Sequence, residues 1–291
     1  MPELPEVETT VRYLAKKIVD LKIKDIWSEW PKTVKQAGGI KNLKKVALGK
    51  KIISVRRRAK YIIIDIEGPK SLFIHQKISG HLLYGKWAFK DNRWMSAGTE
   101  ALKDPKNQHI RFITFFNNGY QLALSDLRRF GKVVLVDDER IKKLKEITSL
   151  GPEPLDVSLK EFEKRFERKR GRIKQVLLDP KFVAGIGNIY GDEILWDIGL
   201  HPLSRVENLD KGDIERILKA TKRILLKAIE NQGSSMDDYR TPSGERGNFQ
   251  NLQKAYQKTG QACSKRDGGK IQRIKINGRS AHFCPVHQIL K

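Results

Sequence analysis

The chain has 291 residues, with 58 Lys plus Arg against 34 Asp plus Glu, so its formal net charge is +24 and its pI is about 10.0. This excess of positive charge favours a polyanionic partner, with nucleic acid ahead of an anionic membrane surface. No run approaches the roughly 18 apolar residues of a membrane span, no signal-peptide core follows the N-terminus, and two cysteines do not make a secreted disulfide scaffold. We therefore expect a soluble cytoplasmic protein with about two domains.

The chain opens with Met1-Pro2-Glu3. If Met1 is removed, Pro2 offers a secondary amine, which can attack an electrophilic sugar carbon and form an iminium, a Schiff base. α-Amino groups titrate at about pH 7.7–8.0, so a useful fraction is unprotonated near neutral pH, and Glu3 lies within reach to move protons. The alternative interpretation is structural: Pro2 starts a helix, and Glu3 and Glu6 complement its dipole.

The first half of the chain predicts one helix followed by short strands. Apolar residues at helical spacing predict a helix over 10–19, and β-branched and aromatic runs separated by turn signals predict a β-sandwich. The expected strands span 52–55, 61–66, 71–75, 110–116, 120–124 and 132–136. We therefore assign residues 1–136 to an N-terminal β-sandwich domain and the charged stretch 137–150 to a linker.

The pattern becomes helical after residue 151, which makes the fold class α+β. Ser158 and Glu161 form a capping box ahead of the first helix, and 232–249 is rich in Gly and Ser and predicts a mobile loop. Further helices are expected at 173–178, from about 188, and at 214–229. Residues 151–249 form the expected helical domain. Residues 250–291 form a basic tail module, in which Asn277-Gly278 predicts a type I′ hairpin.

A glycine turn, Gly185-Ile186-Gly187, precedes the expected helix that starts at Asn188. Such a turn lets backbone N–H groups meet a phosphate, which suits a helix pair that touches a DNA backbone. The glycine pattern of a dinucleotide-binding fold and the Gly-Lys-Ser/Thr of a P-loop are both absent, so a nucleotide cofactor is not expected. A plain tight helical turn is the alternative.

Two further basic clusters lie among the expected strands. Arg128 and Phe130 in a turn could enter a base stack, although an isolated cluster of this kind is more often a charged surface with one core phenylalanine. Lys60 at the start of a strand could anchor a phosphate, or it could belong to a basic edge that protects the sheet.

The tail module carries potential metal ligands. Cys284 and His287 have the spacing of a zinc half-site, whereas the partner half-site has only Cys263, because Arg266 cannot bind zinc. Asp267, one residue further on, is an acceptable ligand. The sequence leaves open a structural zinc site formed by Cys263, Asp267, Cys284 and His287, and a hairpin without zinc in which Arg266 faces DNA.

Seven motifs in this order resemble the formamidopyrimidine-DNA glycosylase family (Fpg/Nei), and more closely its purine-directed branch. These motifs are MPELPEVET at the start, RRAKY around Lys60, HQKISG at 75–80, DLRRFG at 126–131, LGPEPL at 150–155, GIGNIY at 185–190 and NGRS…CPVHQ at 277–288. The resemblance implies a helix–two-turn–helix domain and a C-terminal hairpin finger. It also implies a bifunctional DNA glycosylase and abasic-site lyase of base-excision repair, which removes oxidised purines such as 8-oxoguanine and formamidopyrimidines and cuts the strand by β,δ-elimination.

By this resemblance, Pro2 is the nucleophile, Glu3 the neighbouring acid/base and Lys60 a phosphate ligand near the lesion. Asn188 and Arg279 help to hold the backbone, and a wedge triad of Ile78, Arg128 and Phe130 fills the vacated base stack. The implied partner is double-stranded DNA with oxidised bases or abasic sites, bound by a nucleoid-associated monomer that needs no metal or nucleotide for its chemistry. The spacing of the family hairpin favours Asp267 over Arg266 as a zinc ligand, because sixteen residues separate Asp267 from Cys284.

Three positions depart from the family pattern. Ile78 stands where methionine is usual, Lys77 replaces a glycine, and the finger lacks its full set of cysteines. The first two departures leave the lesion preference open, including oxidised pyrimidines, and the third leaves zinc binding open. Two alternatives from other classes are a non-catalytic binder of damaged or abasic DNA, against which the intact Pro2, Glu3 and Lys60 argue, and, more remotely, an RNA-binding protein.

Overall fold

The computed structural model describes residues 1–141 and 144–291. The chain divides into two compact units, one formed by residues 1–148 and 229–250, the other by residues 149–228 and 251–291. The sequence placed 229–249 with the helical domain and 137–150 in a linker. Instead, 229–250 returns to the first unit, and most of the expected linker also belongs there. The reason for the return is a set of long-range hydrogen bonds described below.

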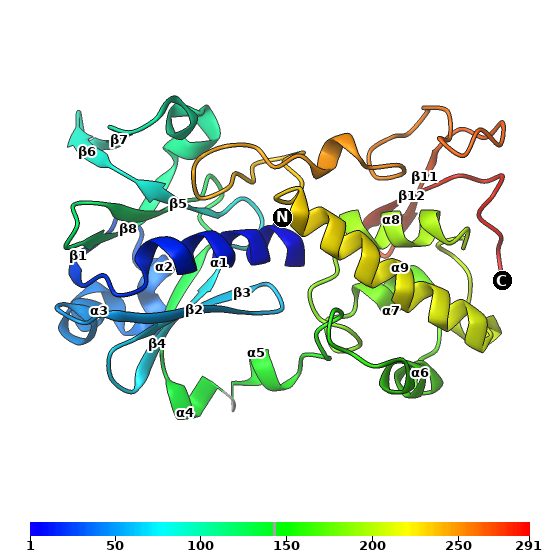
Figure 1. Ribbon diagram of the computed structural model, residues 1–291, viewed down its shortest axis with the longest axis horizontal. Helices are drawn as coiled ribbons and strands as arrows, with labels where there is room; N and C mark the ends of the chain where they lie inside the picture. Colours follow the sequence, from blue (N-terminus) through cyan, green and yellow to red (C-terminus); the bar gives the residue numbers. More distant parts are fainter. Residues whose placement is uncertain (142–143) are drawn as a thin grey trace. The chain divides into compact units, whose positions relative to one another are not determined.

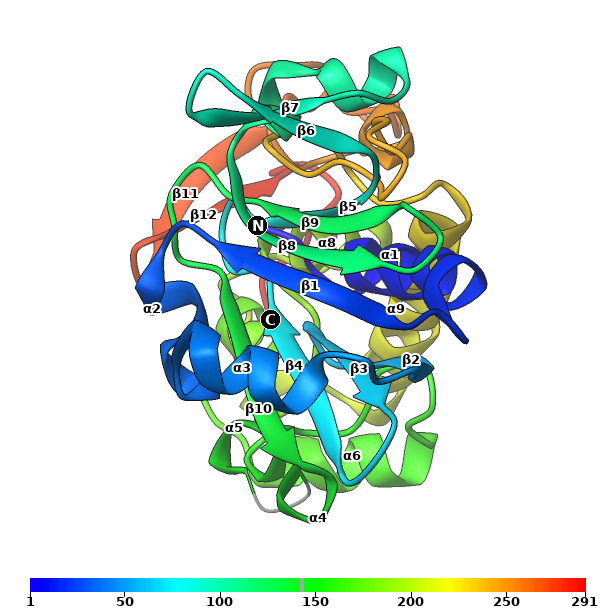
Figure 2. The ribbon, with the colours of Figure 1, turned by 90° about the vertical axis from the view of Figure 1, so that its left-hand side faces the viewer.

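Two antiparallel sheets form the layers of a β-sandwich in the first unit (Figure 2). The first sheet has the order β1 (Ile23–Ser28), β8 (Ile110–Phe116), β9 (Gln121–Ser125) and β5 (His81–Gly85). The second has the order β10 (Lys132–Asp137), β4 (Lys70–His75), β3 (Tyr61–Ile66) and β2 (Ile52–Arg58). The expected β-sandwich and its predicted strands are therefore confirmed, most of them to within one or two residues.

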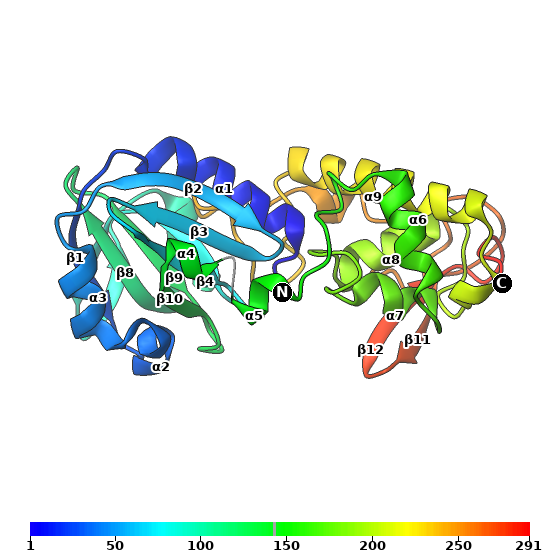
Figure 3. The same ribbon diagram turned by 90° about the horizontal axis from the view of Figure 1, so that it is seen from below.

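The strands alternate between an inner and an outer apolar face, as the pleat of a half-buried strand requires. Ile62 and Ile64 of β3 join the core between the sheets, whereas Ile63 faces outward and packs with Phe73 and Val136. Helices α1 (Leu4–Ile18) and α3 (Gly39–Ala47) contribute to the inner core and lie along opposite edges of the sandwich (Figures 2 and 3).

Helix α1 begins six residues before the predicted helix at 10–19. Pro5 is compatible with the first helical turn, and Glu3 and Glu6 form a reciprocal capping box at the helix start. The sequence also missed several short elements of the first unit. These are α2 (Pro31–Val34), α3, β6 (Trp87–Lys90), β7 (Arg93–Ser96), α4 (Asp138–Ile141), α5 (Lys145–Thr148), and the 3₁₀ turns η1 (Lys35–Ala37), η2 (Glu100–Lys103) and η3 (Pro105–Gln108).

The second unit is helical with one β-hairpin. Its elements are α6 (Leu159–Glu167), α7 (Ile173–Leu178), α8 (Asn188–Asp197), η4 (Val206–Asn208), most of α9 (Lys211–Glu230), β11 (Gln272–Ile276) and β12 (Arg279–Phe283); η5 (Phe249–Asn251) lies at the boundary between the units. Ser158 caps α6 by accepting a hydrogen bond from the Glu161 amide at 3.2 Å. Asn277 and Gly278 both have positive φ, 45° and 78°, as the predicted type I′ hairpin requires.

Candidate active site and nucleic-acid interface

The start of α1 forms a buried group of polar atoms. Pro2 is buried, and Glu3 is only 2% exposed. The Glu3 amide donates to Glu6 Oε2 at 2.8 Å, and the Glu3 carboxylate accepts from the backbone of Glu6. The capping role that the sequence offered as an alternative is therefore present. It places the Glu3 carboxylate beside the N-terminal residues, where it can exchange protons with them.

Glu6 connects this group to the segment 233–247, which we name the return segment. Glu6 Oε1 accepts from the Ser234 amide at 2.7 Å, and the Tyr239 hydroxyl donates to the Glu6 carbonyl at 3.3 Å. A Cβ atom on Gly233 would come within 2.7 Å of Glu6 Oε1, and the φ of Gly233 is +78°, so this position requires glycine. Burial, reinforced by the charge of Glu6, raises the pKa of Tyr239, which keeps its hydroxyl a donor. Sequence reasoning missed the contacts of Ser234 and Tyr239.

Lys60 lies in the tight turn between β2 and β3. Ala59 has a φ of 51°, and Arg57 Nη1 donates to the Ala59 carbonyl at 3.1 Å. Arg57 Nε also binds Glu8 of α1 at 2.7 Å, so the turn is tied to the helix. Burial acts to raise the pKa of Glu8, but hydrogen bonds from Arg57 and Arg12 lower it overall. The turn lies beside the first turn of α1 (Figures 1 and 3), which brings the Lys60 segment near the Pro2 and Glu3 segment.

A buried carboxylate, Asp126, joins the two turns that carry the expected wedge residues. Asp126 Oδ1 accepts from Ser79 Oγ at 2.5 Å and from the Arg128 amide at 3.2 Å, and Oδ2 accepts from the Gly131 amide at 2.7 Å. Ser79 Oγ in turn accepts from the Arg128 amide at 3.0 Å. The 75–80 turn and the 126–131 turn are therefore bound to each other through one side chain that is 1% exposed.

These two turns present the three predicted wedge side chains to solvent. Ile78 is 39% exposed and Phe130 48%, although both are apolar, and the Arg128 guanidinium lies 5.1 Å from the centre of the Phe130 ring. Exposed apolar side chains held on rigid turns are suited to insertion into a base stack. Asp126 is the organising residue that sequence reasoning missed; the available signal was an aspartate that directly follows a buried strand and precedes a turn.

Lys77 adopts a left-handed backbone conformation, with φ of 58°. Glycine favours this conformation, so the lysine costs free energy at this position. The Lys77 amide donates to His75 Nδ1 at 2.9 Å, which requires an unprotonated Nδ1. Burial, with the charges of Lys77, Lys60 and Lys132, lowers the pKa of His75 to about 3. A neutral imidazole therefore supports the turn that carries Ile78.

The second unit carries Asn188 and Arg279. Asn188 is the first residue of α8, and its Oδ1 is buried with no hydrogen-bond partner among the residues that the structure describes. It lines a hollow of about 390 Å³ together with Tyr256, Gln257, Thr259, Arg273, Ser280 and His282. Arg279, at the start of β12, lines a different hollow with Lys174, Gln175 and Asn277. The structure thus places the two predicted phosphate ligands in one unit but in separate hollows.

A buried ionic group fixes these elements to one another. Lys174 Nζ on α7 binds Asp192 Oδ1 on α8 and donates to the Asn188 carbonyl at 3.1 Å. His282 Nδ1 on β12 lies 2.9 Å from Asp192 Oδ2. The Lys174 and Asp192 side chains are 3% and 1% exposed. Breaking such a buried pair is strongly destabilising, so α7, α8 and the hairpin behave as one body.

The four predicted metal ligands of the finger converge. One donor atom from each of Cys263, Asp267, Cys284 and His287 lies within 4.8 Å of all the others. Cys263 Sγ is 3.5 Å from His287 Nδ1, and Cys284 Sγ is 3.3 Å from Asp267 Oδ2. Both distances match the edges of about 3.3–3.8 Å that tetrahedral zinc bond lengths imply. This cluster could hold a metal ion.

The surroundings of the cluster also fit a metal. The Trp196 carbonyl is 3.0 Å from His287 Nε2, and since a carbonyl only accepts, Nε2 carries the hydrogen and Nδ1 faces the cluster. Asp267 Oδ2 lies 2.7 Å from Nδ1, within hydrogen-bonding distance, whereas two ligands of one zinc ion would lie about 3.3 Å apart, so a bound ion requires a small outward shift of this pair. A Cβ atom on Gly269 would come within 2.4 Å of Cys284 Sγ, so the approach to this sulfur requires glycine.

Comparison with known proteins defines the family. The model of the formamidopyrimidine-DNA glycosylase N-terminal domain matches residues 1–133, and that of the formamidopyrimidine-DNA glycosylase H2TH domain matches residues 150–240. The chain is 36% identical to a formamidopyrimidine-DNA glycosylase of Pelotomaculum thermopropionicum and 37% identical to one of Lactococcus lactis subsp. cremoris, with at least 99% of each chain covered. The chain therefore belongs to the formamidopyrimidine-DNA glycosylase family of base-excision repair enzymes, as its motifs predict.

Solved structures agree with this assignment. The Lactococcus lactis Fpg in complex with DNA containing an abasic site superposes with a TM-score of 0.84, at 35% identity and 99% coverage of both chains. The wild-type enzyme of the same organism in complex with DNA containing N7-benzyl-Fapy-dG gives a TM-score of 0.85 at 36% identity, again with 99% coverage of both chains. In the described part of our chain, no helix is long and apolar enough to cross a membrane.

Proposed function

We propose that this protein is a bifunctional DNA glycosylase and abasic-site lyase that removes oxidised purines from double-stranded DNA. The observation that carries the proposal is the start of α1, where buried Pro2 and Glu3 lie beside the turn that carries Lys60. The relatives are named formamidopyrimidine-DNA glycosylases, and solved relatives hold DNA that contains an abasic site or a formamidopyrimidine. A non-catalytic binder would need only the capping role of Glu3 and Glu6, not a removable Met1 before Pro2.

The chemistry begins when Met1 has been removed and the Pro2 nitrogen is a free secondary amine. The nitrogen lone pair attacks the C1′ carbon of the damaged nucleotide, and the base leaves with the electrons of the glycosidic bond. The amine nitrogen loses its proton after the attack. Glu3 then donates a proton to the ring oxygen O4′ as the C1′–O4′ bond breaks, and the nitrogen lone pair forms the C1′=N bond of the iminium. Loss of the C2′ proton then expels the 3′ phosphate by β-elimination, and a second elimination releases the 5′ phosphate.

Binding is shared between backbone contacts and the wedge. Lys60, Asn188 and Arg279 hold phosphates, which positions the damaged nucleotide without reading its sequence. Ile78, Arg128 and Phe130 enter the stack that the extruded nucleotide leaves, and so offset part of the unstacking cost of a few kcal/mol. A net charge of +24 supports an electrostatic search for DNA by a monomer, which fits a nucleoid-associated location.

A second lesion class has its own support. The Lactococcus lactis Fpg has been solved with DNA containing an oxidised pyrimidine, and it superposes on our chain with a TM-score of 0.84. Ile78 and Lys77 also change the wedge turn relative to the family pattern. Oxidised pyrimidines are therefore the second candidate substrate, and 8-oxoguanine and formamidopyrimidines remain the first.

The finger binds a structural zinc ion through Cys263, Asp267, Cys284 and His287. The support is the donor set, the distances and the hydrogen bond that orients His287. Zinc bound there would join Cys263 and Asp267, before the β11–β12 hairpin, to Cys284 and His287, after it. Such a crosslink stabilises the finger, because a module of this size is too small to be held by core burial alone. The ion takes no part in base excision.

The test is strand cleavage and covalent trapping. The protein is incubated with duplexes that contain 8-oxoguanine, a formamidopyrimidine, an oxidised pyrimidine or an abasic site, with and without borohydride. We expect release of the oxidised purine, strand cleavage and a reduced protein–DNA adduct. Binding to all four duplexes without cleavage or adduct would establish the non-catalytic alternative, and preferential cleavage at the pyrimidine would reassign the substrate.

A further inference from the structure

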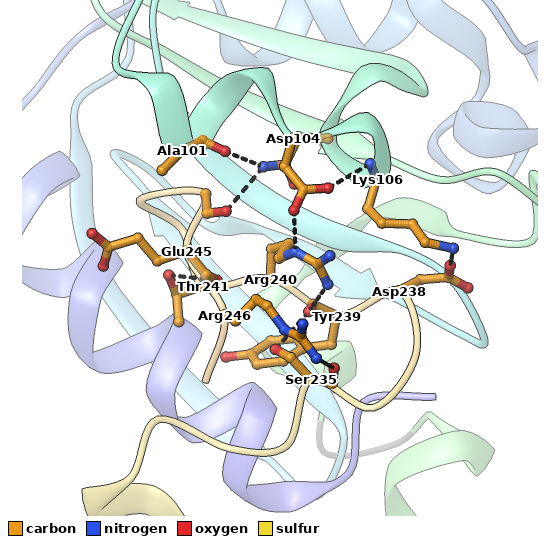
Figure 4. A network of polar contacts seen from close by, with 12 residues as sticks. Ala101, Asp104, Lys106, Ser235, Asp238, Tyr239, Arg240, Thr241, Glu245 and Arg246 are labelled. Carbon is orange, nitrogen blue, oxygen red and sulfur yellow. Dashed lines mark hydrogen bonds and ion pairs between the residues drawn. The ribbon is translucent and has the colours of Figure 1, made fainter. Parts of the chain in front are cut away.

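The return segment is held to the rest of the first unit by two sets of contacts, which meet at residues 238–240. One is the contact of Ser234 and Tyr239 with Glu6 at the start of α1. The other is a polar network with residues 101–107, shown in Figure 4. The sequence predicts a mobile loop at 232–249; in the structure, Ser234, Asp238, Tyr239 and Arg240 of this stretch bind the rest of the first unit.

Two ion pairs dominate the second contact. Asp104 Oδ2 accepts from Arg240 Nε at 2.9 Å, and Lys106 Nζ lies 2.7 Å from Asp238 Oδ1 (Figure 4). The Arg240 side chain is 8% exposed, so this pair is shielded from solvent and salt. Asp104 Oδ1 also accepts from the Lys106 amide at 2.8 Å, which fixes the orientation of the carboxylate. We name these four side chains the clamp.

Backbone contacts reinforce the clamp. Asn107 Nδ2 donates to the carbonyls of Ala101 and Gly244 at 2.8 and 3.1 Å, and the Tyr84 amide of β5 donates to the Pro242 carbonyl at 2.7 Å. A Cβ atom on Gly244 would come within 2.8 Å of the Ala101 backbone, so the two segments are in direct contact. The return segment is therefore docked on the 101–107 segment along much of its length.

The clamp is also connected to the other end of the return segment. Arg240 Nη1 donates to the Tyr239 carbonyl at 2.9 Å, and Ser235 Oγ donates to the same carbonyl at 2.8 Å (Figure 4). Ser235 is the sequence neighbour of Ser234, whose amide donates to Glu6. Through the Tyr239 carbonyl, Arg240 is thus connected to the residues that contact Glu6.

We propose that the clamp of Asp104, Lys106, Asp238 and Arg240 holds the return segment in place before DNA binds, and that these positioning residues set the rate of base excision but not of cleavage at an abasic site. This proposal rests on the proposed glycosylase and lyase function. In the proposed function the extruded base lies near Glu3, and the return segment contacts the same helix start through Ser234 and Tyr239, which bind Glu6; we therefore expect a docked segment to help enclose the base. An abasic site has no base to enclose, so Pro2 reaches its sugar carbon whether or not the segment is docked.

The test uses the full-length protein with Arg240→Gln and Asp104→Asn, and Lys103→Gln as the matched control. Lys103 belongs to the same segment, but its ammonium group pairs with Glu100 at the surface and is not part of the clamp. Amide hydrogen exchange over 233–247 is measured without DNA, and single-turnover rates are measured on a lesion duplex and on an abasic duplex. Restoration of the ion pair is tested with the double variant Asp104→Arg, Arg240→Asp.

We expect Arg240→Gln and Asp104→Asn to accelerate exchange in 233–247. Excision should fall by about 10- to 100-fold, the range of a misplaced site, with abasic cleavage changed less than about twofold. The double variant should recover part of the excision rate, and Lys103→Gln should match the wild type. Unchanged exchange, or equal losses on both duplexes, would overturn the proposal. If the wild type processes neither duplex, the proposed function fails, while the exchange result still decides whether the clamp orders the segment.

Discussion

The start of α1 and the finger cluster are both groups of polar side chains, but they are stabilised differently. Around α1, backbone amides of Glu3, Glu6 and Ser234 satisfy the carboxylates, and glycine at 233 permits the close approach. In the finger, the donors of Cys263, Asp267, Cys284 and His287 face mainly one another. The polar group at α1 is thus held by the fold itself, whereas the mutually facing donors of the finger form a cluster that could hold a cation.

The largest expected effect follows from removing the charge of Glu3. Glu3→Gln keeps the size of the side chain but loses the acid/base function, so base excision should fall by roughly 10²–10⁴-fold. Single-turnover excision on a lesion duplex measures the effect, and Glu67→Gln, at an exposed turn of the second sheet, is the control. Undiminished excision by Glu3→Gln would show that the buried α1 group has only a capping role.

Removing one of the four ligand side chains of the finger should lower the zinc content of the protein. Cys284→Ser removes a thiolate, so the zinc-to-protein ratio should fall from about one to near zero, and thermal stability should decrease because the free energy of zinc binding stabilises the folded module. Elemental analysis without chelator and a melting curve measure these changes. Ser264→Ala, beside Cys263 but outside the cluster, is the control. A ratio near zero in the wild type would establish a finger without zinc.

The 75–80 turn and the 126–131 turn should be held together less tightly when the Asp126 carboxylate loses one of its two hydrogen-bond acceptor oxygens. In Asp126→Asn, one carboxylate oxygen becomes an NH₂ group, which leaves hydrogen-bonding groups of Ser79, Arg128 or Gly131 without an acceptor at a cost of about 1–3 kcal/mol. Discrimination between a lesion duplex and a plain duplex should fall by about tenfold.

Direct binding measurements on both duplexes test this prediction, with Asp91→Asn in the exposed turn between β6 and β7 as the control. Equal losses on the two duplexes would indicate a general loss of stability instead of a displaced wedge.

The smallest expected effect concerns the buried side-chain amide of Gln76. Unlike the Glu6 carboxylate, which accepts hydrogen bonds from backbone amides, this group has no hydrogen-bond partner among the described residues. Gln76 is 1% exposed, and within the described residues its Oε1 and Nε2 have no hydrogen-bond partner. Gln76→Leu removes this penalty with a side chain of similar size, so the free energy of unfolding should rise by about 1 kcal/mol. Denaturant unfolding measures the change, and Gln261→Leu at the surface should be nearly neutral. A destabilised Gln76→Leu protein would indicate a polar environment at this position.

The sequence predicted those elements whose conformation depends on interactions between residues close together in the chain. The strand at 61–66 and the Asn277-Gly278 hairpin were predicted because alternation and turn chemistry act between near neighbours. The metal cluster followed from ligand spacing along a short stretch. The clamp could not be predicted, because Asp104 and Arg240 are 136 positions apart and only the fold brings them together.

The short helices α2 and α3 were missed for a local reason. The 3₁₀ turn η1 and Gly38, at positive φ, separate them. Helix α2 has four residues and α3 nine, both shorter than the window of about 11–18 residues in which helical periodicity is recognised. Asp126 was missed because its sequence signal, an aspartate between a buried strand and a turn, does not show which distant turn the carboxylate will bind.

Peptide mapping of the borohydride-reduced adduct tests the central claim most directly. The protein is trapped on a lesion duplex, digested, and the modified residue is located by mass spectrometry. The account predicts that the sugar is attached to the nitrogen of Pro2, in an N-terminal peptide that has lost Met1. An adduct on Lys60 or another lysine, or on a peptide that still begins with Met1, would contradict it.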